Sequence, residues 1–300
     1  MRPLPSSFLP RLISTLGLWL MITVSYVMHS EGAFFFLISI PALISLWEYF
    51  ALLKAGDIGH HRGLGMGAAL ILVGVNFSLL RCPGMALPLT EGGGGIFGVE
   101  AALLALFVMV LFLREFGRNL PTRPSAEAVA FTFFGVVYIA WLFLFMAKLL
   151  YLTPRDAEGY TTGQYLVLLV IAVTKFTDVG AFLGGSLFGR TPFFPNISPK
   201  KTVEGIIAGV ALGILMGVGV FHFFGEYLPA FSIALVCGLS FVLAIAGVAG
   251  DLAESLLKRS VHTKDSGHAL PGIGGGLDLI DSLLFTLPLF YFLLIFVLHP

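Results

Sequence analysis

The chain has 300 residues, of which 57% are hydrophobic and only 11% are charged. Soluble domains carry about 25% charged residues, so this composition excludes an ordinary soluble protein and predicts an integral membrane protein. The charges of the 17 basic and 17 acidic residues cancel. The chain therefore lacks the excess of positive charge that would favour a nucleic-acid partner. The two cysteines, Cys82 and Cys237, lie far apart in apolar surroundings and do not have a metal-binding spacing.

Long apolar stretches predict the fold class, since a transmembrane helix needs about 20 such residues. We expect an all-α, polytopic bundle of about nine membrane-spanning helices, at 12–28, 33–53, 64–80, 96–113, 128–150, 165–187, 203–224, 229–250 and 279–298. Arg2 and Arg11 precede the first stretch as in a signal peptide. No small-residue cleavage site follows that stretch, so we expect a retained span.

The basic residues predict the orientation of this bundle. With the N-terminus in the cytoplasm, 13 basic residues fall in inside segments, and only Arg81, Lys148 and Arg155 fall in outside segments. Lys175 is left within a span. Because cytoplasmic loops carry an excess of lysine and arginine, we expect the N-terminus and the basic loops in the cytoplasm, where nucleoside triphosphates are available.

The first candidate functional pair lies inside the sixth span, 165–187. Lys175 and Asp178 are three residues apart, so they share a face of the helix. Such a pair can simply neutralise itself. Ionisable groups within a membrane are nevertheless costly and commonly functional, which makes the pair a candidate for binding or catalysis.

The second candidate is the segment 196–205, which opens the seventh span. Pro199 breaks a helix, and Ser198, Lys200 and Lys201 surround it. Ordinary basic flanking of a span would explain the lysines. The functional alternative is a clamp for a triphosphate or a lipid phosphate, built from point charges and hydroxyl groups.

The third candidate is a polar extension of the eighth span. On a helix of about 100° per residue, one arc carries Asp251, Glu254, Ser255, Lys258, Arg259 and His262. An interfacial helix that touches anionic headgroups is one interpretation. Asp251 and Glu254 weigh against it, since anionic lipid repels carboxylates, whereas a hydrated divalent metal binds them.

The fourth candidate follows at once, where Lys264 and Asp265 lead into a glycine-rich run and then into Asp278 and Asp281. Glycines let the backbone approach a ligand and present N–H groups to phosphate. Asp278 and Asp281 share a face at the start of the last span. They can serve as partners of the helix dipole. Beside the glycine run they are better interpreted as ligands of Mg²⁺, which prefers carboxylates together with phosphate oxygens.

These residues together resemble the phosphatidate cytidylyltransferase, or CDP-diacylglycerol synthase, family. The family's C-terminal signature is matched by Ser255, Lys258, Arg259, Lys264, Asp265, Gly267, Leu270, Pro271, Gly274, Gly275, Asp278 and Asp281. The segments ISPKKTVEG and TDVGAFLGGSLFGR resemble two further family blocks. The signature's histidine, apolar residue and arginine are replaced here by Ile273, Gly276 and Leu279, which leaves substrate choice open.

The resemblance implies an Mg²⁺-dependent enzyme of phospholipid biosynthesis in a bacterial cytoplasmic (inner) membrane. CTP and phosphatidic acid would give CDP-diacylglycerol and pyrophosphate, and a second cation is left open. We expect residues 1–160 to form about five N-terminal spans, and residues 161–300 to form the catalytic transmembrane region with the signature segment 251–282. The expected roles are catalytic for Lys258, Arg259, Lys264 and Asp265; substrate-binding for Ser198, Lys200, Lys201, Ser255, Gly274 and Gly275; and metal-binding for Asp251, Asp278, Asp281 and Asp178.

Two alternatives remain at this stage. One is another CTP-dependent lipid enzyme, such as a prenol kinase or a cytidylyltransferase acting on a different lipid. The other is a transporter in which Lys175 and Asp178 line a path. Transporters commonly contain repeated halves, and the C-terminal charge cluster has no counterpart in the N-terminal half, which favours an enzyme. A homodimer is compatible with such a bundle, although no residue requires it.

Overall fold

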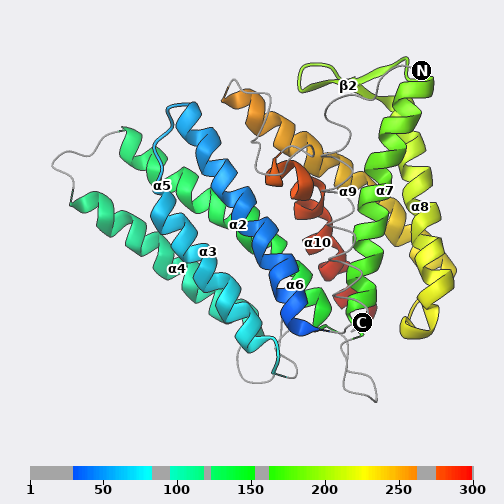
Figure 1. The fold of residues 1–300 in the computed structure, drawn as a ribbon, viewed down its shortest axis with the longest axis horizontal. Coiled ribbons are helices and arrows are strands. Elements are labelled where there is room, and N and C mark those ends of the chain that lie inside the picture. Colours follow the sequence, from blue (N-terminus) through cyan, green and yellow to red (C-terminus); the bar gives the residue numbers. More distant parts are fainter. Residues whose placement is uncertain (1–29, 83–94, 118–122, 153–161, 262–274, 299–300) are drawn as a thin grey trace, which may run out of the picture. The chain divides into compact units, whose positions relative to one another are not determined.

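The computed structural model describes residues 30–82, 95–117, 123–152, 162–261 and 275–298. Eight helical stretches within these ranges are long and apolar enough to cross a membrane (Figure 1). They coincide with the second to ninth predicted spans, whereas the first, 12–28, lies outside the described residues. The prediction of a polytopic membrane bundle of helices is confirmed.

The chain divides into two compact units, Met1–Ala147 with Ser260–Ile280, and Lys148–Arg259 with Asp281–Pro300. The first unit contains α2 (Glu31–Ala55), α3 (Arg62–Leu79), α4 (Gly95–Phe116), α5 (Arg123–Gly135) and the π-helical turn η1 (Val136–Trp141). The second contains α7 (Gln164–Phe188), β1 (Pro192–Phe194), β2 (Ser198–Thr202), α8 (Val203–Phe224), η2 (Gly225–Tyr227) and α9 (Ile233–Ser260). Two helices, α6 (Phe145–Leu150) and α10 (Gly276–Leu298), begin in the first unit and end in the second.

The core of the first unit is built around the aromatic side chains of α2. Tyr49 and Phe50 are buried, and the Tyr49 hydroxyl donates a hydrogen bond to the carbonyl of Phe131 on α5 at 3.0 Å. On α4, the buried carboxylate of Glu100 accepts a hydrogen bond from the indole of Trp141 at 2.8 Å. Polar groups buried away from water need such partners, so these bonds fix the register of the helices.

In the second unit, α7 and α8 pack through small residues. Four buried glycines of α8 follow one another at four-residue intervals, at Gly205, Gly209, Gly213 and Gly217. A Cβ atom at Gly209 would lie only 2.6 Å from the carbonyl oxygen of Thr177 on α7. The two backbones therefore touch, as helices in membranes do where small residues recur on one face.

A short antiparallel hairpin of β1 and β2 connects α7 to α8 (Figure 1), an element that the all-helical expectation did not include. Glu204 fixes the base of this hairpin. Its carboxylate accepts hydrogen bonds from the backbone amides of Arg190 and Thr191, at 3.0 and 3.1 Å. The side chain of Thr202 caps α8 by accepting a hydrogen bond from the amide of Gly205. The strand that carries the two lysines of the predicted phosphate clamp is thus attached directly to a transmembrane helix.

Candidate active site

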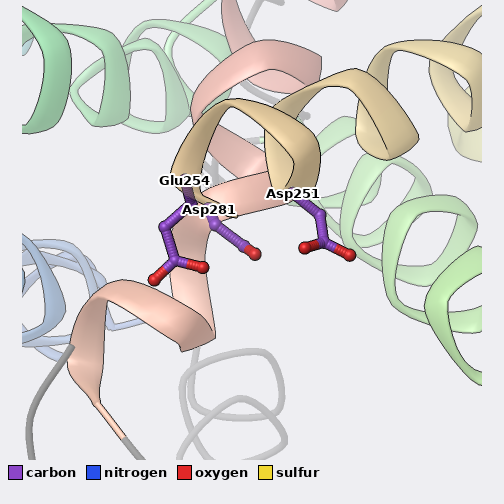
Figure 2. Close-up of side chains that lie close together, drawn as sticks. All are labelled: Asp251, Glu254 and Asp281. Atoms are coloured by element: carbon purple, nitrogen blue, oxygen red, sulfur yellow. The ribbon is translucent and has the colours of Figure 1, made fainter. Parts of the chain in front are cut away.

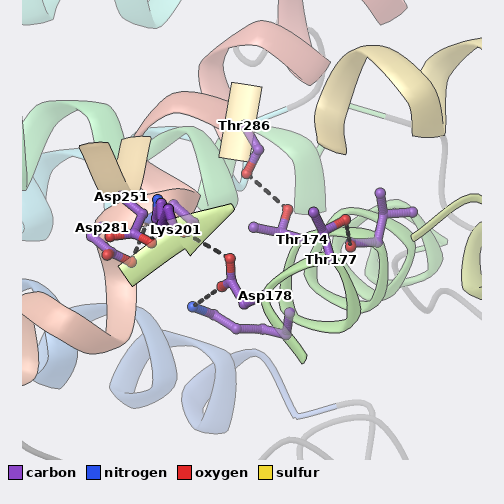
Figure 3. Close-up of polar contacts among 10 residues, drawn as sticks. Thr174, Thr177, Asp178, Lys201, Asp251, Asp281 and Thr286 are labelled. Atoms are coloured by element: carbon purple, nitrogen blue, oxygen red, sulfur yellow. Dashed lines mark hydrogen bonds and ion pairs between the residues drawn. The ribbon is translucent and has the colours of Figure 1, made fainter. Parts of the chain in front are cut away.

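Close contact between α9 and α10 brings the acidic residues of the second unit together. A Cβ atom at Gly250 would lie 2.7 Å from the carbonyl oxygen of Asp281 and 2.9 Å from the Cα of Ser282. Since only glycine fits here, the two helix backbones meet directly beside Asp251. One turn further along α10, the hydroxyl of Thr174 on α7 donates a hydrogen bond to Thr286 at 3.1 Å (Figure 3). These contacts fix α10 between α7 and α9.

Three carboxylates gather at this contact. Asp251 and Glu254 of α9 and Asp281 of α10 each place an oxygen within 4.8 Å of the others (Figure 2). Glu254 and Asp281 are buried, and Asp251 is half-buried. Carboxylates this close repel one another unless cations offset their charge. Hard oxygen donors of this kind are the ligands that Mg²⁺ and Mn²⁺ prefer, so the group fits a divalent metal ion.

Lysines are paired with the acidic side chains around this group. The Nζ atom of Lys201 on β2 lies 2.6 Å from Asp251 Oδ2. Within α9, Lys258 Nζ lies 2.9 Å from Glu254 Oε2.

On α7, Lys175 Nζ lies 3.5 Å from Asp178 Oδ2, and the Ser282 hydroxyl of α10 donates a hydrogen bond of 3.4 Å to the other oxygen of Asp178 (Figure 3). The pair expected from the sequence therefore exists, and it contacts the helix that carries Asp281. Lys175, Lys201 and Lys258 are thus each paired with a carboxylate, and a lysine whose partner is neutralised by another cation could bind a phosphate instead.

A pocket of about 320 Å³ opens beside these residues. Its charged lining residues are Asp178, Lys200, Lys201 and Asp251. Its apolar wall includes Phe182 of α7, Ile206 of α8 and Val248 of α9. A site with one ionic wall and one apolar wall suits a ligand that is itself amphiphilic, and its volume lies in the range of small-molecule sites.

The structure places the predicted site residues as follows. Asp178, Lys200, Lys201 and Asp251 line one pocket, and Asp281 lies in the carboxylate group with Asp251. Ser198 lies at the start of β2, and Ser255, Lys258 and Arg259 follow Asp251 on α9. Asp278 lies in the first turn of α10, where its carboxylate accepts a hydrogen bond from the amide of Gly275 at 2.9 Å. Lys264, Asp265 and Gly274 lie outside the described residues.

Two acidic residues gain importance from the structure. The sequence pattern indicated that Glu254, like Asp251, suits a divalent metal, but Glu254 was not among the residues assigned to the metal; the structure places it in the carboxylate group. Its position three residues after Asp251 was the signal that could have identified it. Glu204 fixes the hairpin that carries Lys200 and Lys201. In the sequence it resembles an ordinary acid in the first turn of a helix, so no signal singled it out.

The sequence is similar to those of known proteins. Residues 10–297 match the model of the family described as the cytidylyltransferase family. A phosphatidate cytidylyltransferase of Staphylococcus aureus (strain COL) is 33% identical over 194 residues, covering 65% of this chain and 68% of the relative. A relative of the same name from Bacillus subtilis (strain 168) is 34% identical over 197 residues, covering 66% and 69%. One from Helicobacter pylori (strain ATCC 700392 / 26695) is 47% identical over 123 residues, covering 41% and 44%.

Proposed function

The chain belongs to the cytidylyltransferase family, and from this premise we propose that it transfers the cytidylyl group of CTP to phosphatidate. The products are CDP-diacylglycerol and pyrophosphate. The observation that carries the proposal is the group of Asp251, Glu254 and Asp281, with Asp251 also lining a pocket that has an ionic and an apolar wall. A reaction between a nucleoside triphosphate and an acidic lipid needs both features.

The carboxylate group is the proposed site of Mg²⁺, held by Asp251, Glu254 and Asp281. Asp178, whose side chain also lines the pocket, and Asp278 stay further proposed ligands, and a second cation stays open. When bound, Mg²⁺ would offset the repulsion between two polyanionic substrates and the charge that develops on the leaving pyrophosphate.

In the proposed reaction, a phosphate oxygen of phosphatidate forms a bond to the α-phosphorus of CTP. The bond from that phosphorus to the oxygen that bridges it to the β-phosphorus breaks, and its electron pair leaves with pyrophosphate. Because the nucleophile is already an anion, no strong general base is required. The work of the protein is to bring two anions together in line, which is a matter of charge and position.

Basic and hydroxyl groups around the pocket would hold the phosphates. We assign substrate binding to Ser198, Lys200, Lys201, Ser255, Gly274 and Gly275. Lys258, Arg259 and Lys264 would stabilise the transferring phosphate, with Asp265 orienting Lys264. The apolar wall at Phe182, Ile206 and Val248 would receive the glycerol and acyl part of the lipid.

The proposal also includes an orientation in the membrane. The excess of basic residues in alternate loops supports a cytoplasmic N-terminus, and CTP would reach the pocket from the cytoplasm of a bacterial cell. The proposed chemistry does not require a homodimer.

Product analysis tests the proposal against a CTP-dependent kinase. The purified full chain in detergent is supplied with CTP labelled at its α-phosphate, Mg²⁺, and phosphatidate, a polyprenol or diacylglycerol as acceptor. We expect labelled lipid only when phosphatidate is the acceptor, with one pyrophosphate released for each CDP-diacylglycerol formed. Diacylglycerol is the matched control because it lacks the attacking phosphate. Release of labelled CDP with any acceptor would indicate a kinase and reject the proposal.

A further inference from the structure

In the first unit, the start of α10 rests directly on α2. A Cβ atom at Gly276 would lie 2.6 Å from Cγ2 of Ile44 and 3.4 Å from the amide nitrogen of Ser45. Glu48, one helical turn further along α2, accepts a hydrogen bond at Oε2 from the backbone N–H of Leu277, at 3.0 Å. Two consecutive residues of α10 are therefore fixed to a single turn of α2.

The bond between Glu48 and Leu277 is buried. Glu48 is 3% exposed and Leu277 is 0% exposed. The first backbone N–H groups of a helix have no partner within the helix, and a carboxylate at that end also interacts favourably with the helix dipole. In a membrane protein, such an N–H group away from water must find its partner inside the protein. A residue 229 positions away in the sequence supplies it here.

We propose that Glu48 is a positioning residue for α10. Asp278 follows Leu277 directly, and Asp281 lies one turn beyond it on the same helix. A helix rotates by about 100° per residue, so the rotation and height of its first turn determine where these carboxylates point. By holding the Leu277 amide, Glu48 sets the direction of the carboxylates of α10 through the backbone. This inference rests on the proposed function, since it concerns the carboxylates assigned there to the metal.

The close approach at Gly276 gives independent support. The resembled signature has an apolar side chain where this chain has Gly276, and any side chain there would collide with Ile44. The absence of a side chain at Gly276 thus allows α10 to lie close enough to α2 for Glu48 to reach the Leu277 amide. Glu48 and Gly276 together fix the start of α10 against α2.

Variants of Glu48 test the proposal in the purified full chain in detergent. Glu48→Leu removes the acceptor, whereas Glu48→Gln keeps an amide oxygen that accepts the same N–H. Glu31→Gln is the matched control on α2, because Glu31 pairs with Arg81 at 2.9 Å near the opposite end of that helix. We measure the dissociation constant of Mn²⁺ by electron paramagnetic resonance, kcat and KM with CTP and phosphatidate, and the Tm.

We expect Glu48→Leu to weaken Mn²⁺ binding and to lower kcat by about tenfold or more, while KM for phosphatidate changes by less than about threefold. Glu48→Gln should recover most of both values, and Glu31→Gln should match the wild type. Unchanged Mn²⁺ affinity in a folded Glu48→Leu protein would overturn the proposal. A Glu48→Gln protein as impaired as Glu48→Leu would also overturn it. The same conclusion would follow if Glu48→Leu lowered the Tm but left Mn²⁺ binding and kcat unchanged.

A second pair of variants applies if Glu48→Leu does not fold. Gly276→Ala should weaken Mn²⁺ binding, and adding Ile44→Ala should restore it by making room for the new methyl group. If the folded double variant still binds Mn²⁺ weakly, the proposed contact between the start of α10 and α2 is contradicted.

Different results would reject the proposed function and the positioning role of Glu48. If the wild-type protein binds Mn²⁺ but makes no CDP-lipid, the proposed function is rejected. If the wild type is active and Glu48→Leu is equally active, only the positioning role is rejected.

Discussion

The ammonium group of Lys201 lies 2.6 Å from a carboxylate oxygen of Asp251 and so joins strand β2 to helix α9 at the wall of the pocket. Both side chains remain partly exposed, at 20% and 34%. A lysine and a metal ion compete for the same oxygen. We therefore expect the lysine to balance the charge of Asp251 until the metal binds, after which the ammonium group becomes available to a phosphate.

This relationship predicts opposite effects of Lys201→Gln on metal binding and on turnover. Removing a positive charge beside Asp251 should tighten Mn²⁺ binding in the absence of nucleotide by about threefold to tenfold. Loss of a phosphate-binding charge should lower kcat/KM for CTP by about tenfold to a hundredfold, or ~1.4–2.7 kcal/mol. Mn²⁺ titration and initial rates measure the two effects. Lys54→Gln, which removes an exposed lysine at the end of α2, serves as the control. Weaker Mn²⁺ binding in Lys201→Gln would contradict this relationship.

Glu254→Gln tests whether the carboxylate group binds metal as a unit. Glu254 is buried with Asp281 and lies within 4.8 Å of its carboxylate and that of Asp251. Losing one of three charged ligands should weaken Mn²⁺ binding by about tenfold or more, measured by titration of the purified protein. Glu226→Gln removes an exposed acid of the same unit and should leave the affinity unchanged. Equal affinities in the two variants would exclude Glu254 from the metal site.

Gly250→Ala tests the helix contact that brings the acids together. The added methyl group would lie 2.7 Å from the Asp281 carbonyl, so α9 and α10 must move apart. We expect a lower Tm from a cost of about 1–3 kcal/mol, and a loss of kcat of about tenfold or more.

Gly238→Ala is a matched control on the same helix, because nothing lies within 4 Å of a Cβ atom at that position. Alanine favours helix over glycine by about 0.8–1 kcal/mol, so this variant should keep or raise the Tm and retain activity. Equal behaviour of the two variants would show that the close contact at Gly250 has no role.

Hydropathy and spacing predicted a large part of this structure. Each of the eight described spans coincides with an apolar stretch, because a helix that crosses a membrane needs about 20 predominantly apolar residues. The three-residue spacing of Asp251 and Glu254 likewise predicted one helix face. Such local patterns do not reveal which helices touch. The contact of Gly250 with α10 depends on how the two backbones pack. A glycine in an apolar stretch does not indicate which other helix will lie against it.

Two further features could not be predicted, for related reasons. The segment Ser198–Thr202 forms a strand, although its proline and lysines give no alternation of apolar and polar residues. Its conformation is fixed from outside, by the carboxylate of Glu204. The partner of Glu48 lies 229 residues away and is a backbone group, which almost any residue at that position would supply. A sequence pattern records side chains, so a contact to the backbone leaves no trace in it.

The most direct test of the proposed activity is Mg²⁺-dependent formation of CDP-diacylglycerol by wild type and by Asp251→Asn. Asp251 belongs both to the carboxylate group and to the pocket wall, so its charge joins the proposed metal site to the proposed substrate site. With CTP labelled at the α-phosphate and phosphatidate in detergent, we predict label in lipid only with Mg²⁺. We also predict that Asp251→Asn lowers the rate by about a hundredfold or more at saturating Mg²⁺. A folded Asp251→Asn protein with undiminished turnover would contradict the proposed role of this carboxylate group.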